Sequence, residues 1–248
     1  MAVTANNRKS RQPLSRERIL NAAVLLADRQ GVEALSMRAL GRELGVKAMS
    51  LYKHVTNKDD ILDGIVDIVL SQIDLPPHGT EWRKAMDDRA RSARQVFLQH
   101  PWIAALFESR LARPQQTPIR LRYLNTIIGL LRQNGFSVSN AYRALLLIDS
   151  YLYGFTQQEV NWQLKDDNVL HKAEEAVYQV LMEKYPYIFE LYTHLSSQNA
   201  GFSIYLDTEF DLGLELIFDA LEKLRETGTK FDSPDTPTSL PDSDGEDC

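Results

Sequence analysis

The sequence predicts an all-α protein in two parts, an N-terminal three-helix domain and a larger helical bundle behind it. Apolar residues recur at intervals of three and four along nearly every segment, which is the period of an amphipathic helix. No segment alternates convincingly between apolar and polar residues, so no strand is expected. Capping residues and Gly or Pro pairs separate the periodic stretches and place the helix ends.

Caps define the first helices. Ser15, Ser36 and Asn57 are residues whose side chains accept a hydrogen bond from the first turn of a helix. Gly31 and Gly45 suit the turn that ends one. We therefore expect helices between Ser15 and Gly31, between Ser36 and Gly45, and after Asn57. The positions expected to pack the N-terminal helices together are Ile19, Ala22, Ala23, Leu26, Ala27, Leu40, Leu44, Leu51 and Val55.

The stretch 36–54 predicts a helix-turn-helix. A short helix reaches the tight turn at Gly45, and a second short helix runs from about Ala48 to His54. In this motif the exposed side chains of the second helix can enter a DNA major groove. The sequence therefore favours a DNA-binding protein.

The charge distribution agrees with this prediction. The whole chain has a net charge of −6. Residues 1–55 contain ten Lys or Arg against four Asp or Glu, a net charge of +6, whereas the remainder has eighteen against thirty, a net charge of −12. A basic head on an acidic body is expected when only one end of a protein meets phosphate.

Breaks between periodic segments divide the rest of the chain. The sequence Pro-Pro-His-Gly at 76–79 ends the connecting helix, and Thr80 is a plausible cap for the next one. Further breaks fall at 100–101, 117–118 and 134–135. The expected helices span about residues 80–99, 101–112, 118–133, 139–162, 169–184, 186–195 and 207–226.

These segments predict five regions. Residues 1–12 form a disordered basic arm, and the tail from Gly228, with six acids against one lysine, is too polar to fold. The predicted regions are the arm 1–12, the helix-turn-helix domain 13–57, the connecting helix and linker 58–79, a second helical domain 80–227, and the acidic tail 228–248.

Composition excludes several other classes of protein. No apolar run reaches the roughly 18 residues of a membrane span, and the N-terminus lacks the apolar core of a signal peptide. The only cysteine, Cys248, rules out an intrachain disulfide, so a cytoplasmic location is expected. The five histidines have no zinc-like spacing, and no phosphate-binding loop or nucleophile motif is present. We therefore expect no cofactor, no metal and no enzymatic activity.

The head resembles the TetR family of transcriptional regulators. The residues that carry this resemblance are Gly-Val-Glu-Ala-Leu-Ser-Met-Arg at 31–38, Gly-Val at 45–46 and Leu-Tyr-Lys-His-Val-Thr-Asn-Lys at 51–58. More loosely, the body is similar to the C-terminal domain of tetracycline repressors. There the matching pieces are Gln-Asn-Gly-Phe-Ser at 133–137, Tyr-Gly at 153–154 and Asp-Leu-Gly-Leu-Glu-Leu-Ile at 211–217.

The resemblance implies the residues that contact DNA. Base contacts would come from Arg38 and the second helix of the motif, and phosphate contacts from residues around its end. Arg38 can donate two hydrogen bonds to guanine, and Met49 can touch a thymine methyl group. A solvated side chain is an equally good interpretation for Lys53, and Tyr52 could instead be a core tyrosine. The predicted DNA-binding residues are Arg38, Lys47, Ala48, Met49, Ser50, Tyr52, Lys53, His54 and Lys58.

The resemblance also implies an effector pocket in the body. Tetracycline repressors hold a drug-bound magnesium ion with a histidine and a glutamate, and the matching positions here are Phe107 and Gln158. Phenylalanine cannot bind a metal, so tetracycline with magnesium is not the expected effector. Most aromatic residues of such helices are simply core. The candidate pocket residues are Trp82, Met86, Arg89, Phe97, Phe107, Tyr123, Tyr151, Phe155 and Gln158.

A single helix-turn-helix covers too few base pairs for useful specificity, so a twofold dimer on a palindrome is expected. The helices 139–162 and 207–226 have more apolar surface than one core-facing stripe needs, and they predict a four-helix-bundle interface. The candidate interface residues are Leu145, Ile148, Leu214, Ile217, Phe218 and Leu221.

The function expected from these features is repression that a small-molecule effector relieves. Two alternatives stay open. A regulator of this kind could lack a small-molecule ligand and be controlled by a protein partner or act as an activator. An enzyme or scaffold could also have borrowed the head.

Overall fold

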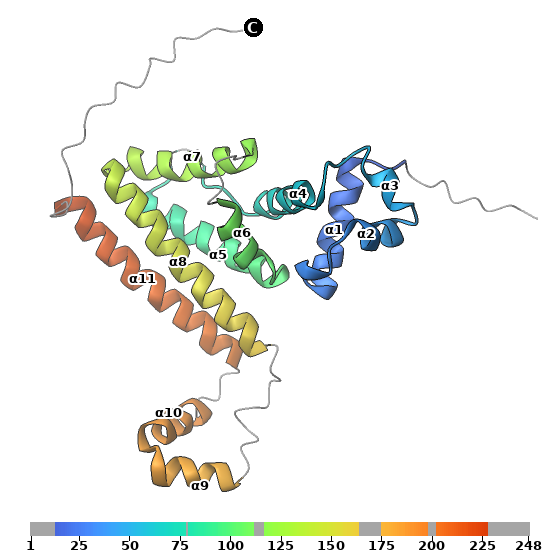
Figure 1. Cartoon of the computed structure of the whole chain (residues 1–248). Helices are drawn as coiled ribbons and strands as arrows, with labels where there is room; N and C mark the ends of the chain where they lie inside the picture. The colour runs from blue at the N-terminus through green and yellow to red at the C-terminus, as the bar shows by residue number, and fades with distance from the viewer. Residues whose placement is uncertain (1–12, 78, 112–116, 164–174, 198–201, 228–248) are drawn as a thin grey trace, which may run out of the picture. The chain divides into compact units, whose positions relative to one another are not determined.

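The computed structural model describes residues 13–77, 79–111, 117–163, 175–197 and 202–227 (Figure 1). All secondary-structure elements assigned in these ranges are helices, so the predicted all-α class is confirmed. None of the helices in these ranges is long and apolar enough to cross a membrane. The predicted disordered arm 1–12, the tail 228–248 and the first part of the helix expected at 169–184 lie outside the described residues.

The contacts divide the chain into two compact units. The first holds the residues up to Asp74 together with Ser92–Arg122, and the second holds Leu75–Arg91 and the chain from Tyr123 onward. The functional boundaries expected at residues 57 and 79 stay predictions. The α-helices are α1 (Arg16–Gln30), α2 (Met37–Leu44), α3 (Ala48–Leu51), α4 (Lys58–Leu70), α5 (Trp82–Gln99), α6 (Ile103–Leu111), α7 (Pro118–Gln133), α8 (Val138–Gln163), α9 (Glu175–Lys184), α10 (Pro186–Ser197) and α11 (Phe202–Thr227).

The predicted caps of the N-terminal helices are confirmed. The Ser15 hydroxyl accepts a hydrogen bond from the Arg18 amide at 3.2 Å, and the Ser36 hydroxyl accepts one from Ala39 at 3.1 Å. Gly45 ends α2 with φ of +65°, in the left-handed region that glycine adopts without a steric penalty. Local sequence chemistry thus sets where these helices start and stop.

Two glycines let the helices of the first unit approach closely. A Cβ atom on Gly41 of α2 would lie 3.0 Å from the Val46 carbonyl oxygen, and one on Gly64 of α4 would lie 2.6 Å from a Leu20 methyl carbon of α1. Ile19, Ala23, Leu40, Leu51 and Val55 are all buried between these helices, as the apolar spacing predicted. Leu44 is only partly buried.

The second unit is centred on α8 and α11, which lie side by side and run antiparallel (Figure 1). The Asn140 side chain donates to the Leu224 carbonyl at 3.1 Å near one end, and the Tyr151 hydroxyl donates to the Glu209 carbonyl at 3.0 Å farther along. Trp82 of α5 packs edge-on against aromatic rings of α7–α8 and α11, which joins α5 to this pair.

Three expected helix ends differ in the structure. The recognition helix α3 ends at Leu51 and not at His54, because the chain turns at Tyr52 toward the cap of α4. Glu81, not Thr80, caps α5: its carboxylate accepts from the amides of Arg83 and Lys84, both at 2.9 Å. The last helix begins at Phe202, five residues before the expected start, and Leu206, which lies in this added part, is buried.

Candidate nucleic-acid interface and effector site

The second helix of the helix-turn-helix, α3, has one buried face and one exposed face. Leu51 and Val55 are buried, with exposed fractions of 0% and 3%, and hold α3 to the other helices. On the opposite side Met49 is 75% exposed and Tyr52 is 49% exposed. Large exposed side chains on a short, rigidly seated helix are available to a partner surface.

All nine predicted DNA-binding residues are accessible. None of them is buried, and Tyr52 is therefore not a core tyrosine. The exposed members of the set are Arg38, Lys47, Met49, Tyr52 and Lys53, and the half-buried members are Ala48, Ser50, His54 and Lys58.

Asp60, in the first turn of α4, organises the loop that follows α3. Its carboxylate oxygens lie 2.6 and 2.9 Å from the two terminal nitrogens of Arg16, and one oxygen also accepts from the Thr56 amide at 2.7 Å. The Asn57 side chain accepts from the Asp60 amide and caps α4, as predicted. The hydrogen bond from Arg16 lowers the pKa of Asp60 below its ordinary value, so the carboxylate stays charged.

The second unit contains a buried polar cluster at Arg89. Its guanidinium Nη2 lies 2.7 Å from both the Tyr123 hydroxyl oxygen and an Asp149 carboxylate oxygen, and its Nε lies 3.0 Å from the same hydroxyl. Burial acts to lower the pKa of Arg89, but the carboxylate of Asp149 and the nearby tyrosines raise it overall, so the side chain stays charged. Its Nη1 atom is buried and has no hydrogen-bond partner among the described residues.

The other candidate pocket residues are mostly core residues. Trp82 donates its indole N–H to Glu222 at 2.9 Å, which satisfies its one polar group. Tyr151 and Phe155 are half-buried against Phe210. Gln158 is exposed on α8, whereas the next residue, Glu159, is buried. The candidates that are buried are Trp82, Met86, Arg89, Phe97, Phe107 and Tyr123.

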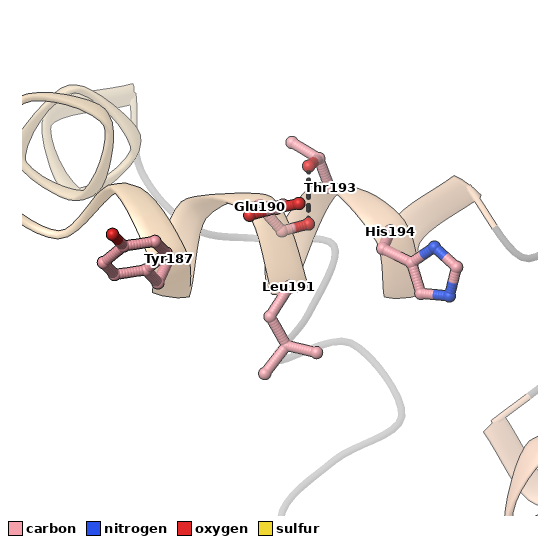
Figure 2. A pocket seen from close by; sticks show the side chains of 5 residues that line it. All are labelled: Tyr187, Glu190, Leu191, Thr193 and His194. Atoms are coloured by element: carbon pink, nitrogen blue, oxygen red, sulfur yellow. Dashed lines mark hydrogen bonds between the residues drawn. The ribbon is translucent and has the colours of Figure 1, made fainter.

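A concavity of about 570 Å³ lies on α10 (Figure 2). Its lining residues come from this single helix, so it is an open hollow and does not enclose a small molecule. Nothing in the sequence pattern of these residues distinguishes them from an amphipathic helix face. They are Tyr187, Glu190, Leu191, Thr193 and His194.

Phe107, the residue expected at the magnesium position of tetracycline repressors, is apolar. Phe107 is 1% exposed and offers only carbon atoms. No group of three or more metal-binding side chains occurs in the part of the chain that the structure describes. The residues present do not fit a magnesium ion at this position.

Five of the six candidate interface residues face the core of their own unit. Only Ile217 is partly exposed; the other five are buried within the second unit, where Phe218 packs against Trp82 of α5. Side chains buried in this way are not available to a partner subunit. The large apolar residues that the two helices leave exposed are Val138, Tyr142, Leu146 and Leu147 on α8 and Leu212 and Leu216 on α11.

An anchored helix-turn-helix with exposed polar and apolar side chains, followed by a helical body, defines the class of helix-turn-helix DNA-binding regulators. The model of the family described as bacterial regulatory proteins, tetR family, matches residues 19–65, and that of the tetracyclin repressor-like C-terminal domain matches residues 75–225. The chain belongs to the TetR family of transcriptional regulators. The predicted family is confirmed, and the relatives are regulators and not enzymes.

Curated relatives and solved structures agree with this assignment. An HTH-type transcriptional regulator of Saccharopolyspora erythraea is 34% identical over 181 residues, which are 70% of this chain and 75% of that protein. The HTH-type transcriptional repressor DrrR1 of Streptomyces coeruleorubidus is 31% identical over 230 residues, 88% of this chain and 82% of that protein. The structure of the TetR family protein ActR of Streptomyces coelicolor in complex with actinorhodin is 27% identical, has a TM-score of 0.67, and covers 85% of this chain and 96% of that one.

Proposed function

We propose that this protein is a cytoplasmic transcriptional repressor that binds a palindromic operator as a homodimer and is released by a small-molecule effector other than tetracycline with magnesium. The observation that carries the proposal is the exposed surface of α3 above the buried anchors Leu51 and Val55. The similarity to a repressor over most of the chain supports repression as the outcome of DNA binding.

In this proposal the exposed residues divide the work of DNA recognition. Arg38 donates to guanine, and Met49 and Ala48 contact thymine methyl groups, so these residues select the sequence. Tyr52, His54 and Lys58 contact phosphates and fix the register of the head on the duplex. Lys47, Ser50 and Lys53 complete the contact surface.

The homodimer would form through the outer faces of α8 and α11. Tyr142 and Leu146 lie one helical turn apart on α8, as do Leu212 and Leu216 on α11, and all four are exposed in the single chain. Apolar stripes on two adjacent helices are suited to a four-helix bundle with their copies. These exposed residues, together with Ile217, form the proposed interface in place of the five buried candidates.

The effector would bind the body near the polar cluster of Arg89. A buried guanidinium nitrogen without a partner can donate to a ligand oxygen at little further desolvation cost. ActR, which is 27% identical to this chain, has been crystallised with actinorhodin and with (S)-DNPA. This similarity supports a small organic effector for the present protein. Phe107 argues against a metal-bound drug, because its side chain has no atom that can coordinate a cation or accept a hydrogen bond from metal-bound water.

Release would follow from a change in the connecting helix α4. In the free dimer the two recognition helices would lie about one DNA turn, roughly 34 Å, apart. Effector binding in the body would tilt α4 and change this spacing. A coupling free energy of about 1–3 kcal/mol is typical of such systems and sufficient for release.

The test is selection of bound duplexes from a random pool by the full-length protein at near-physiological salt. We expect a palindrome with two half-sites. Arg38→Ala should relax the base preference at one position in each half-site. Lys58→Ala should weaken binding to all sequences alike and should reduce, by about one, the slope of log affinity against log salt concentration. Lys84→Ala, which removes an exposed lysine of α5, is the matched control and should change neither. Recovery of no sequence above non-specific binding would overturn the proposal.

A further inference from the structure

Helix α4 has an acidic stripe that meets two buried arginines. Asp59, Asp63 and Asp67 follow one another at intervals of four residues, so their side chains lie on one face of the helix. Arg110 of α6 is 4% exposed and Arg120 of α7 is 0% exposed. All five residues belong to the first unit. We call this group the α4 clasp.

The contacts of the clasp extend over two turns of α4. Arg110 Nη2 lies 2.8 Å from an oxygen of Asp59, and its Nη1 lies 3.3 Å from an oxygen of Asp63. Arg120 Nη2 lies 3.2 Å from the same Asp63 oxygen and donates to the Asp63 carbonyl at 3.0 Å. Arg120 Nε lies 3.0 Å from an oxygen of Asp67, and that oxygen also accepts from the Thr117 hydroxyl at 2.9 Å.

This arrangement permits only one register of α4 against α6 and the start of α7. Guanidinium groups donate in fixed directions, so a rotation or translation of α4 would break several contacts together. A buried arginine that loses its carboxylate is strongly destabilising, because its charge is then unpaired away from water. The clasp therefore resists displacement of α4 more than apolar packing alone would.

The clasp reaches the end of α4 that follows the recognition helix. Asp59 is the second residue of α4 and follows Lys58, a proposed phosphate contact. The next residue, Asp60, is held by Arg16 of α1. The same turn of α4 is thus gripped by α6 through one aspartate and by the DNA-binding helices through the next.

We propose that Arg110 and Arg120 are positioning residues that fix the orientation of α4 and, through it, the half-site spacing that the dimer accepts. The inference rests on the proposed binding of a homodimer to a palindromic operator. It assigns a role in operator choice to two residues that are not themselves proposed DNA contacts.

The experiment uses the palindrome recovered by the wild-type full-length protein, in a series with the half-sites moved together or apart by one and by two base pairs. The wild-type protein should prefer one spacing by roughly tenfold or more, the size of a lost base contact. Arg110→Met and Arg120→Met should bind several spacings with affinities within a fewfold of one another. Asp63→Asn, which keeps the shape of the shared carboxylate but removes its charge, should do the same and still tests the clasp if an arginine variant does not fold.

Two controls separate orientation from stability. Ile65→Val removes one methylene from the buried side of α4, so it should lower stability without changing the spacing preference. Arg91→Met removes an arginine of α5 that pairs with Asp87 and Asp211, and it should leave the preference unchanged. Wild-type spacing preference in folded Arg110→Met, Arg120→Met and Asp63→Asn would overturn the inference. Absence of any two-half-site preference in the wild-type protein would instead overturn the proposed function and this inference with it.

Discussion

At the scale of single residues, Asp60 does the most to shape the candidate DNA surface. Recognition residues are useful only if the backbone that bears them is held in one conformation. The carboxylate of Asp60 joins Arg16 at the start of α1, the amide of Thr56 in the loop and the first turn of α4. One side chain thus ties the α4 end of the segment between α3 and α4 to the start of α1.

The first prediction concerns Asp60→Asn. The variant should lose about 1 kcal/mol of stability at neutral pH. The ion pair with Arg16 is partly exposed and contributes little, but the hydrogen bond from the Thr56 amide to the carboxylate is also weakened. Because the pKa of Asp60 is lowered in the folded protein, this stabilisation is fully present above the ordinary value of 3.8 and is lost as the pH falls through the lowered pKa. Thermal unfolding followed by circular dichroism at several pH values measures it. A difference from wild type that grows as the medium becomes more acidic would contradict this account.

The second prediction compares two glycines inside helices. Replacement of a mid-helix glycine by alanine ordinarily stabilises a helix by up to about 1 kcal/mol. Gly129 of α7 has open space where a Cβ would lie, so Gly129→Ala should raise the melting temperature. At Gly41 the new Cβ would lie 3.0–3.3 Å from backbone atoms of Val46 and Ala48, so Gly41→Ala should lower it and weaken DNA binding. Equal shifts in melting temperature for the two variants would show that the approach of α2 to α3 is not tight.

At the scale of elements, the structure separates what local sequence determines from what packing determines. The caps Ser15, Ser36 and Asn57 were predictable because each satisfies backbone amides within three residues. The early start of α11 was not, because it depends on tertiary packing, in which Leu206 is buried. Apolar spacing likewise predicts that a residue faces inward, but it does not tell a pocket wall from a packed seam.

The candidate sites follow the same division. The accessibility of the helix-turn-helix residues was predictable. The turn at Gly45 and the buried leucines Leu40 and Leu51 leave one outer face of the motif. The partners of Arg89 and the α4 clasp were not predicted, because they join residues that lie about 34 to 60 positions apart in the chain. The four-residue spacing of aspartates in α4 was the one signal in the sequence that pointed to the clasp.

The third prediction tests the cap of α5. Glu81→Ala removes the acceptor of two amides in the first turn and should cost about 1 kcal/mol. Thr80→Ala should cost less, because the Thr80 hydroxyl only donates to the Pro77 carbonyl in the preceding turn. Melting temperatures of the two variants measured side by side decide between the caps. A larger loss in Thr80→Ala would restore the cap that the sequence predicted.

At the scale of the whole molecule, basic charge and exposed apolar surface belong to different parts of the chain, as the proposed DNA-binding homodimer requires. The basic head has a net charge of +6 and the rest of the chain −12, so attraction to phosphate is confined to one end. The apolar residues that α8 and α11 leave exposed recur at intervals of four on two adjacent helices, which is the pattern of a bundle interface. Binding to a palindrome requires both features in the same molecule.

The last prediction follows from the proposed dimer. Leu216 is 63% exposed in the single chain, so Leu216→Glu should leave the fold intact and place four unfavourable charges in the bundle interface when combined with Leu146→Glu in both subunits. Sedimentation equilibrium should then show a monomer, and affinity for the palindrome should fall to that of a single half-site, because the two heads are no longer linked. Leu191→Glu on α10 is the matched control, since that leucine is similarly exposed but lies outside the proposed interface. A double variant that stays dimeric and keeps full operator affinity would place the interface elsewhere on the chain.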